Sequence, residues 1–194
     1  MKPGVSQRPS PSDRKLPPEA DAPEVVEWAG KFVTAKRRGR WEYAGRARNI
    51  HAAVILAVDA GEVILVEQYR VPCARWCLEL PAGLIGDEVE GEQALDSARR
   101  ELEEETGYRA AQWEVLGEFL ASPGMLSESF TLVKATGLTQ VSDGGGVEGE
   151  EILVHRVPLS RIAEVVAEHR AMGNAIDVKL LLLLGSTFLE DAAQ

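Results

Sequence analysis

The sequence predicts a mixed α/β domain preceded by a short arm, and three observations lead to this fold class. The 194 residues suit one domain of ordinary size plus some extra chain, since domains run to roughly 100–200 residues. Apolar, β-branched runs alternate with segments of helical periodicity, without an internal repeat. No stretch approaches the roughly 18 apolar residues of a membrane-spanning helix, and no secretory signal is visible. We therefore expect a cytoplasmic protein that does not enter a membrane.

The chain divides into three regions by composition. Residues 1–23 hold six of the ten prolines and too few apolar side chains to offset the entropy of ordering, so we expect a flexible arm. Residues 24–48 follow, in which 31–35 and 40–45 predict a β-hairpin that exposes Trp41 and Tyr43. Residues 49–194 are expected to form the main domain.

The elements of the main domain follow from turns and periodicity. The runs 51–58 and 62–69 flank an Asp-Ala-Gly turn and predict a hairpin of largely buried strands. A strand at 76–80 stops at Pro81, and a loop is expected over 82–91. A helix from about 92 to 106 ends at Gly107, because glycine readily takes the positive φ that terminates helices. Further strands are predicted at 113–120, 130–135 and 151–157, and further helices at 159–172 and 175–189.

The net charge of −10 is unevenly distributed. Residues 87–105 hold nine acidic and two basic side chains, a local balance of −7. An acidic chain lacks the basic surface that releases counterions from nucleic acid, so we expect no nucleic-acid partner. The two cysteines lie four residues apart without a second pair or a histidine cluster in sequence, and thus predict no zinc site.

Three glutamates of the predicted helix occupy one face. Glu101, Glu104 and Glu105 stand at positions i, i+3 and i+4, where like charges repel by a few tenths of a kcal/mol. Carboxylates without nearby histidine or cysteine are typical ligands of the hard cations Mg²⁺ and Mn²⁺. A merely solvated acidic face is the alternative reading of this spacing.

The segment 86–108, GDEVEGEQALDSARRELEEETGY, resembles the Nudix box. The matching positions are Gly86, Glu92, Arg100, Glu101, Leu102, Glu104, Glu105 and Gly107. The flanking segments VEQYR (66–70), LELPAG (78–83), LASPG (120–124) and EGEEI (148–152) resemble the ADP-ribose pyrophosphatase branch. In that branch the box begins at the glycine of Pro-Ala-Gly. Here Gly83 lies three residues too early, so either the loop carries an insertion, which we favour, or Gly86 has taken over its role.

The resemblance implies a fold, a reaction and a set of roles. The fold is the Nudix α/β/α sandwich with a mixed β-sheet, and the reaction is metal-dependent hydrolysis of a nucleoside diphosphate derivative, most specifically ADP-ribose to AMP and ribose 5-phosphate. Mg²⁺, with Mn²⁺ as a possible substitute, is expected on Glu101, Glu104, Glu105 and the Ala82 carbonyl. Substrate contacts are expected from Arg70, Glu79 and Glu128, and structural roles from Gly83, Gly86, Glu92, Arg100 and Gly107.

Other roles implied by the resemblance remain open. Glu148 matches the proposed general base, with Glu150 and Glu151 as competitors on the same glycine-bearing loop. Trp41 or Tyr43 would stack on the nucleobase across a homodimer formed by region 24–48, or else would lie in the dimer core. The alternative substrates are GDP-sugars, UDP-sugars and NADH. A noncatalytic nucleotide sensor is the alternative from another class, although such proteins usually lose box glutamates.

Overall fold

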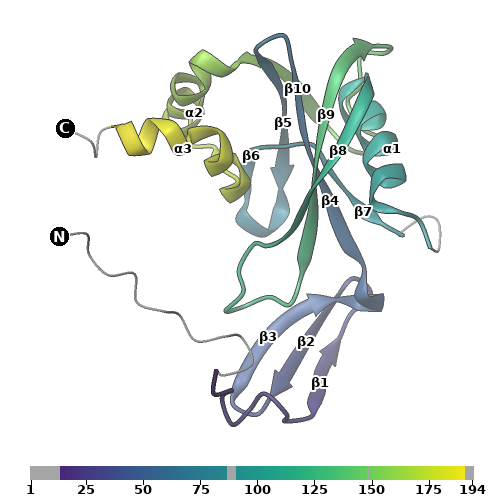
Figure 1. Ribbon diagram of the computed structural model, residues 1–194, viewed down its shortest axis with the longest axis vertical. Helices are drawn as coiled ribbons and strands as arrows, with labels where there is room; N and C mark the ends of the chain where they lie inside the picture. The colour runs from purple at the N-terminus through teal and green to yellow at the C-terminus, as the bar shows by residue number, and fades with distance from the viewer. Residues whose placement is uncertain (1–13, 87–90, 148, 191–194) are drawn as a thin grey trace, which may run out of the picture.

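The computed structural model describes residues 14–86, 91–147 and 149–190, which form two β-sheets and flanking helices (Figure 1). The smaller sheet is antiparallel and consists of β1 (Glu24–Ala29), β2 (Val33–Arg38) and β3 (Trp41–Arg46). Strands β2 and β3 form the predicted hairpin. β1 adds a third strand that the sequence does not signal, because all six of its residues are exposed and no buried alternation marks it.

The larger sheet carries the main domain. Its strands are β4 (His51–Asp59), β5 (Glu62–Arg70), β6 (Arg75–Glu79), β7 (Ala82–Ile85), β8 (Tyr108–Leu120), β9 (Ser129–Gln140), β10 (Ile152–Pro158) and β11 (Ala175–Ile176). The order is β11-β6-β5-β4-β9-β8, with β10 on β5 and β7 on β4. The pairs β4–β9 and β11–β6 are parallel and the others are antiparallel. The predicted mixed sheet is confirmed.

Helices cover both faces of this sheet. α1 (Ala94–Thr106) lies on one face and α2 (Ile162–Ala171) and α3 (Leu181–Glu190) on the other (Figure 1). Alternate residues of β4 serve the two sides, because Ile55 packs in the cluster that contains Leu102 of α1, whereas Val54 packs in the cluster that contains Val166 of α2. The predicted α/β/α layering is confirmed. No helix within the described ranges is long and apolar enough to cross a membrane.

The sheet divides at the hairpin of β4 and β5. These strands pair only beside their turn, at Val58–Val63 and Asp59–Glu62. Beyond that point β4 pairs with β7 and β9, whereas β5 pairs with β6 and β10. The first half of β4 and the last half of β5 therefore diverge and leave an opening between the two parts of the sheet.

Three elements differ from the sequence predictions. β7 occupies part of the predicted loop, because its four residues pair with β4, a contact that its short sequence does not encode. β8 begins directly after α1, at Tyr108, and a two-residue β11 replaces the start of the predicted last helix. α1 itself ends as predicted, with Gly107 at φ +74°.

Candidate active site

A cavity of about 440 Å³ lies in the opening between the two parts of the large sheet. Strands β4, β5, β6 and β7 and helix α1 contribute to its walls. Nine predicted site residues line it: Arg70, Glu79, Ala82, Gly83, Arg100, Glu101, Glu104, Glu105 and Glu128. The tertiary structure thus brings together acidic and basic groups that are up to 58 residues apart in the sequence.

Arg100 connects the carboxylates of α1. Its Nη1 atom lies 3.0 Å from Glu101 Oε1 and 3.1 Å from Glu104 Oε2, and its Nε lies 3.5 Å from Glu92 Oε1. Glu92 in turn accepts a hydrogen bond from the Gly86 N–H at 3.1 Å. Gly86 and Glu92 do not line the cavity, but through these contacts they join the strand β7 to the start of α1.

Gly83 in β7 and Gly86 just after this strand have different structural roles. A Cβ on Gly83 would lie 1.9 Å from the carboxyl carbon of Glu101, so a larger residue here would require the Glu101 side chain to move. Gly86 instead takes φ +77°, where the chain leaves the strand. The neighbouring Ala82 N–H donates to Glu105 Oε2 at 3.0 Å. β7 therefore holds the Glu105 carboxylate through a hydrogen bond and leaves room for that of Glu101.

Burial shifts the titration of these carboxyl groups. Glu105 is 6% exposed, and burial raises its pKa from 4.5 to about 8, against the hydrogen bond from Ala82, which lowers it. Burial also raises the pKa of Glu101, while the charge of Arg100 opposes this shift. Both carboxylates are thus costly to ionise in the protein alone. A cation in the cavity would favour their charged forms.

Basic side chains face these carboxylates from other elements. Arg70 donates two hydrogen bonds to Glu79, at 2.6 and 2.8 Å, and Arg46 donates to Glu128 at 2.8 Å. Lys179 also lines the cavity, and its Nζ atom lies 2.6 Å from Asp177 Oδ2. Sequence reasoning missed Arg46 and Lys179, because both lie outside the motifs. Their only local signals are a basic residue at a strand end and an Asp-x-Lys turn.

Residues 141–147, 149 and 150 follow β9 and lie against the end of α1. The N–H groups of Gly145 and Gly146 donate to the carbonyls of Glu105 and Glu104 at 2.9 and 3.0 Å, and thus satisfy the last turn of the helix. Glu150 lines the cavity and accepts a hydrogen bond from the Val147 N–H at 3.3 Å. Glu151 is exposed and does not line it. Glu148, the predicted base, lies outside the described residues.

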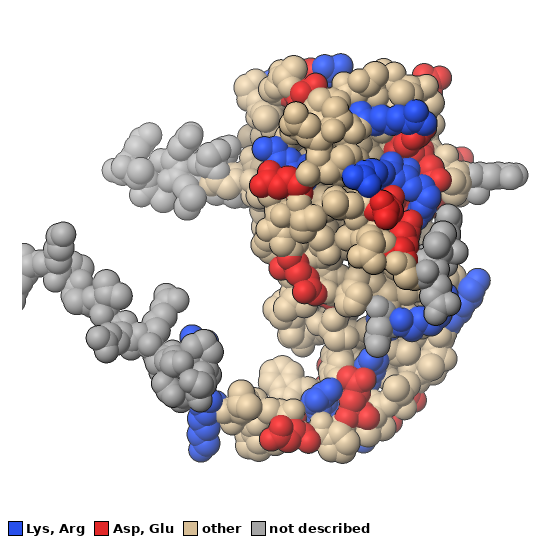
Figure 2. Space-filling view, turned by 45° about the vertical axis from the view of Figure 1, so that its right-hand side comes forward, with Lys and Arg blue, Asp and Glu red and all other residues tan. Residues whose placement is uncertain are grey.

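Two other predicted residues do not reach the cavity. Trp41 is 51% exposed on β3 and lies outside the lining of the cavity in its own chain. Gly107 lies behind the site, where a Cβ would lie 2.2 Å from the Ser142 carbonyl oxygen. The outer side of α1 carries ion pairs such as Arg109–Glu103, and Figure 2 shows acidic and basic side chains next to one another on this side of the molecule.

Comparison with known protein families identifies the family of this chain. The family described as NUDIX domain matches residues 47–171, which include β7, α1 and the loop that follows β9. This chain belongs to the Nudix hydrolase family. The match covers the strands, the helix and the glutamates that form the cavity, and it leaves out the smaller sheet.

Two curated proteins are similar to this chain over about half of its length. A methanol dehydrogenase activator of Bacillus methanolicus is 39% identical over 52% of this chain and 53% of its own length. An ADP-ribose pyrophosphatase of Mycobacterium tuberculosis is 42% identical over 46% of this chain and 42% of its own length. The chain spans about half the length of these curated relatives.

The fold has a solved counterpart. A crystal structure described as that of an ADP compounds hydrolase superposes with a TM-score of 0.63 and covers 87% of this chain and 93% of its own. The two sequences are 22% identical, so this likeness concerns the fold. Because the superposition extends over most of both chains, it includes more than the matched Nudix segment.

Proposed function

We propose that this chain hydrolyses the diphosphate bond of a nucleoside diphosphate derivative, with ADP-ribose as the substrate and AMP and ribose 5-phosphate as the products. The observation that carries this proposal is that Arg46, Arg70 and Lys179 line the same cavity as the α1 glutamates. Carboxylates alone repel a diphosphate, and basic groups alone do not activate water. The combination suits an anionic substrate that is bound together with cations.

The donor set of the cavity fits Mg²⁺, and Mn²⁺ as a substitute. Glu101, Glu104 and Glu105, with the Ala82 carbonyl, are the proposed ligands, and all of them are oxygen donors on residues that line the cavity. When bound, such a cation neutralises the diphosphate and lowers the pKa of a coordinated water. Burial of Glu105 fits this assignment, because a buried carboxylate with a raised pKa is stabilised by a nearby positive charge.

The remaining residues have proposed positions in the reaction. Arg70, with its guanidinium held by Glu79, is placed to bind a phosphate through the N–H groups that the Glu79 carboxylate leaves available. Glu128 holds Arg46 through one hydrogen bond from Nε. Arg100 fixes the directions of Glu101 and Glu104. Glu148 is the proposed general base, and Glu150, which lines the cavity, is its competitor.

The smaller sheet supports the proposal of a homodimer. Val26, Trp28, Phe32 and Trp41, in the strands of this sheet or the turn between β1 and β2, are each between 51% and 60% exposed, and exposed apolar surface is typical of protein–protein interfaces. A partner chain that covers this sheet would bury them and would bring Trp41 toward the second cavity, where a flat ring can stack on a nucleobase. Sedimentation equilibrium tests the dimer, and Trp28→Lys is expected to yield monomers.

A substrate panel tests the proposed activity. ADP-ribose, GDP-mannose, UDP-glucose and NADH are each incubated with the full chain and Mg²⁺ or Mn²⁺, and the products are separated by ion-exchange chromatography. We expect ADP-ribose to have the highest kcat/KM and to yield AMP. Preference for a GDP-sugar, a UDP-sugar or NADH would overturn the substrate, and binding without turnover of any compound would instead support a nucleotide sensor.

A further inference from the structure

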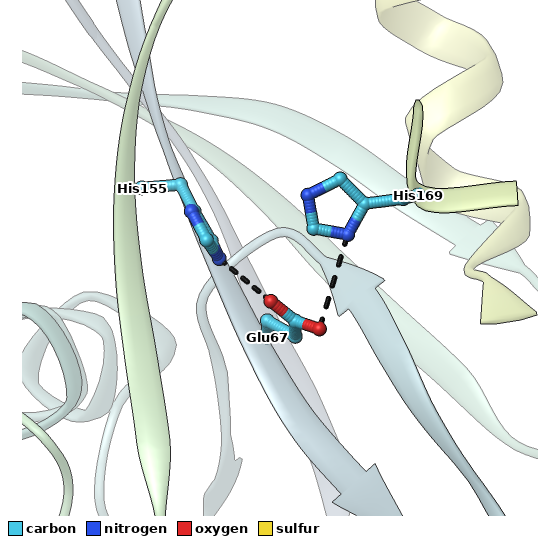
Figure 3. A group of neighbouring side chains, drawn as sticks. All are labelled: Glu67, His155 and His169. Atoms are coloured by element: carbon cyan, nitrogen blue, oxygen red, sulfur yellow. Dashed lines mark hydrogen bonds and ion pairs between the residues drawn. The ribbon is translucent and has the colours of Figure 1, made fainter. Parts of the chain in front are cut away.

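Two of the three histidines of the chain meet at one carboxylate, away from the cavity. Figure 3 shows Glu67 of β5 between His155 of β10 and His169 of α2. Glu67 Oε2 lies 2.9 Å from His155 Nε2, and Glu67 Oε1 lies 3.9 Å from His169 Nδ1. One ligand atom from each of the three residues lies within 4.8 Å of the other two.

The hydrogen bonds of Asn174 fix the state of His169. The Asn174 Nδ2 atom lies 2.6 Å from Glu67 Oε1 and 3.1 Å from His169 Nδ1. Because an amide nitrogen can only donate, Nδ1 accepts a hydrogen bond from Asn174, and the same amide also donates to Glu67. His169 Nδ1 and Glu67 Oε1 are therefore two acceptors 3.9 Å apart, and the Asn174 amide is the donor between them. A cation that takes the place of this amide at Nδ1 would bind both acceptors.

The site is enclosed and lies on the other face of the sheet from α1. The exposed fractions of the side chains are 11% for Glu67, 7% for His169 and 31% for His155. Glu67 follows Val63 and Leu65 along the side of β5 that packs in the cluster containing α2, and none of the three ligands lines the cavity. A cation can thus reach the group past His155 and would be largely shielded from water once bound.

We propose that Glu67, His155 and His169 form a Zn²⁺ site with a water as the fourth ligand. Two imidazoles and a carboxylate are an established zinc donor set, and imidazole is a poor ligand for Mg²⁺. Zinc ligands at about 2.1 Å in a tetrahedron are separated by about 3.4 Å, which lies between the 2.9 and 3.9 Å observed at Glu67. Zinc would displace the Asn174 amide from His169 Nδ1, whereas the hydrogen bond of Asn174 to the Glu67 carboxylate can persist and orient that ligand.

Zinc at this position would connect side chains from three elements, β5, β10 and α2. It would join the last turn of α2 to the neighbouring strands β5 and β10, next to the point where the chain turns into β11. We therefore expect Zn²⁺ to stabilise the fold, without direct contact with the substrate. The inference is independent of the proposed hydrolysis, because Gln68, the neighbour of Glu67, points to the opposite side of β5 and lines the cavity.

Competition with a chromophoric chelator tests the site in the untagged full chain, stripped of metal and kept in excess Mg²⁺ so that the α1 carboxylates are occupied. We expect one Zn²⁺ per chain with a Kd below about 10 µM, and a loss of affinity of at least about 100-fold in His155→Ala and in His169→Ala. The matched control is His51→Ala, which removes the third histidine and should leave the affinity unchanged. Equal affinity in all three variants, or no binding to the wild-type chain, would overturn the proposal.

NMR of the imidazole rings provides a test on the wild-type chain, so it does not depend on whether the histidine variants fold. The three histidines give three ring spin systems in ¹H–¹⁵N spectra. Zn²⁺, added to one equivalent, should shift the ring nitrogens of His155 and His169 and leave those of His51 in place. Shifts confined to His51, or no shift of any ring, would show that zinc does not bind at this group.

Discussion

Glu24 in the smaller sheet and Glu105 in the cavity illustrate two opposite treatments of a carboxylate. Glu24 accepts a hydrogen bond from Tyr43 Oη at 2.6 Å and lies 3.0 Å from Lys36 Nζ. These contacts, the one with Tyr43 first, lower the pKa of Glu24 from 4.5 to about 2. Glu105 is buried beside other glutamates, and burial raises its pKa to about 8. The same side chain is stabilised as an anion in one region and destabilised in the other.

The difference separates a structural carboxylate from a binding one. Donors within the chain already satisfy Glu24, so its charge contributes to the fold. The charge of Glu105 is only partly offset by the Ala82 N–H, which leaves capacity for a cation from solution. Active sites commonly retain such unfavourable arrangements, at some expense of stability. Four experiments test this contrast.

The largest effect is expected from Glu105→Gln. The substitution removes the charge but retains an oxygen that can accept from the Ala82 N–H, so the fold should persist while Mg²⁺-dependent turnover of ADP-ribose falls by about 10³-fold. Steady-state kinetics measure this loss. The matched control is Glu103→Gln on the exposed side of α1, where Glu103 pairs with Arg109 and turnover should stay within about twofold. Equal turnover in both variants would refute the proposed role of Glu105.

Gly83→Ala should have the next largest effect. The new Cβ would collide with the Glu101 carboxylate and push it out of position. We therefore expect kcat to fall by about 10–100-fold and the Mg²⁺ concentration for half-maximal activity to rise. Gly124→Ala is the control, because a Cβ there meets nothing within 4 Å. A Gly83→Ala enzyme with unchanged kcat and unchanged Mg²⁺ dependence would contradict the close approach.

The pH dependence of stability should reveal the raised pKa of Glu105. Because the folded state binds this proton more tightly than the unfolded state, the contribution of Glu105 is fully present below about pH 4.5 and is lost as the pH rises through about 8. In the absence of divalent metal, the free energy of unfolding of Glu105→Gln, relative to that of the wild type, should therefore increase by about 1–3 kcal/mol between pH 4.5 and 9. Urea unfolding in EDTA measures this difference. A difference that does not vary with pH would argue against the shift.

Glu24 should give the smallest effect and the opposite sign. Its folded pKa lies below the ordinary value, so its contribution is present above about pH 4.5 and is lost as the pH falls toward about 2. At pH 7 we expect Glu24→Gln to lower the free energy of unfolding by less than about 1 kcal/mol, because solvent screens the charge of Glu24. Carboxyl NMR titration of Tyr43→Phe should show the Glu24 pKa rising toward 4.5; an unchanged value would rule out Tyr43 as the main cause.

Local patterns predict much of the fold. The hairpin of β4 and β5 follows from two β-branched runs around a turn, and the end of α1 follows from Gly107, because both depend on residues that are neighbours in sequence. The sequence does not predict β1 and β7 as strands. β1 buries no residue, and β7 exists through its pairing with β4. Strands that depend on a distant partner leave little trace in their own residues.

The sequence by itself determined the spacing of Glu101, Glu104 and Glu105, and with it the acidic face of α1 and the resemblance to the Nudix box. The tertiary structure alone decided what faces that acidic helix. It brought Arg46 and Lys179 to the same cavity, set Gly83 against Glu101, and gathered His155 and His169 around Glu67. The reason is physical: helical periodicity is a property of consecutive residues, whereas burial, pKa shifts and ligand clusters arise only when the strands of the divided sheet bring distant side chains together.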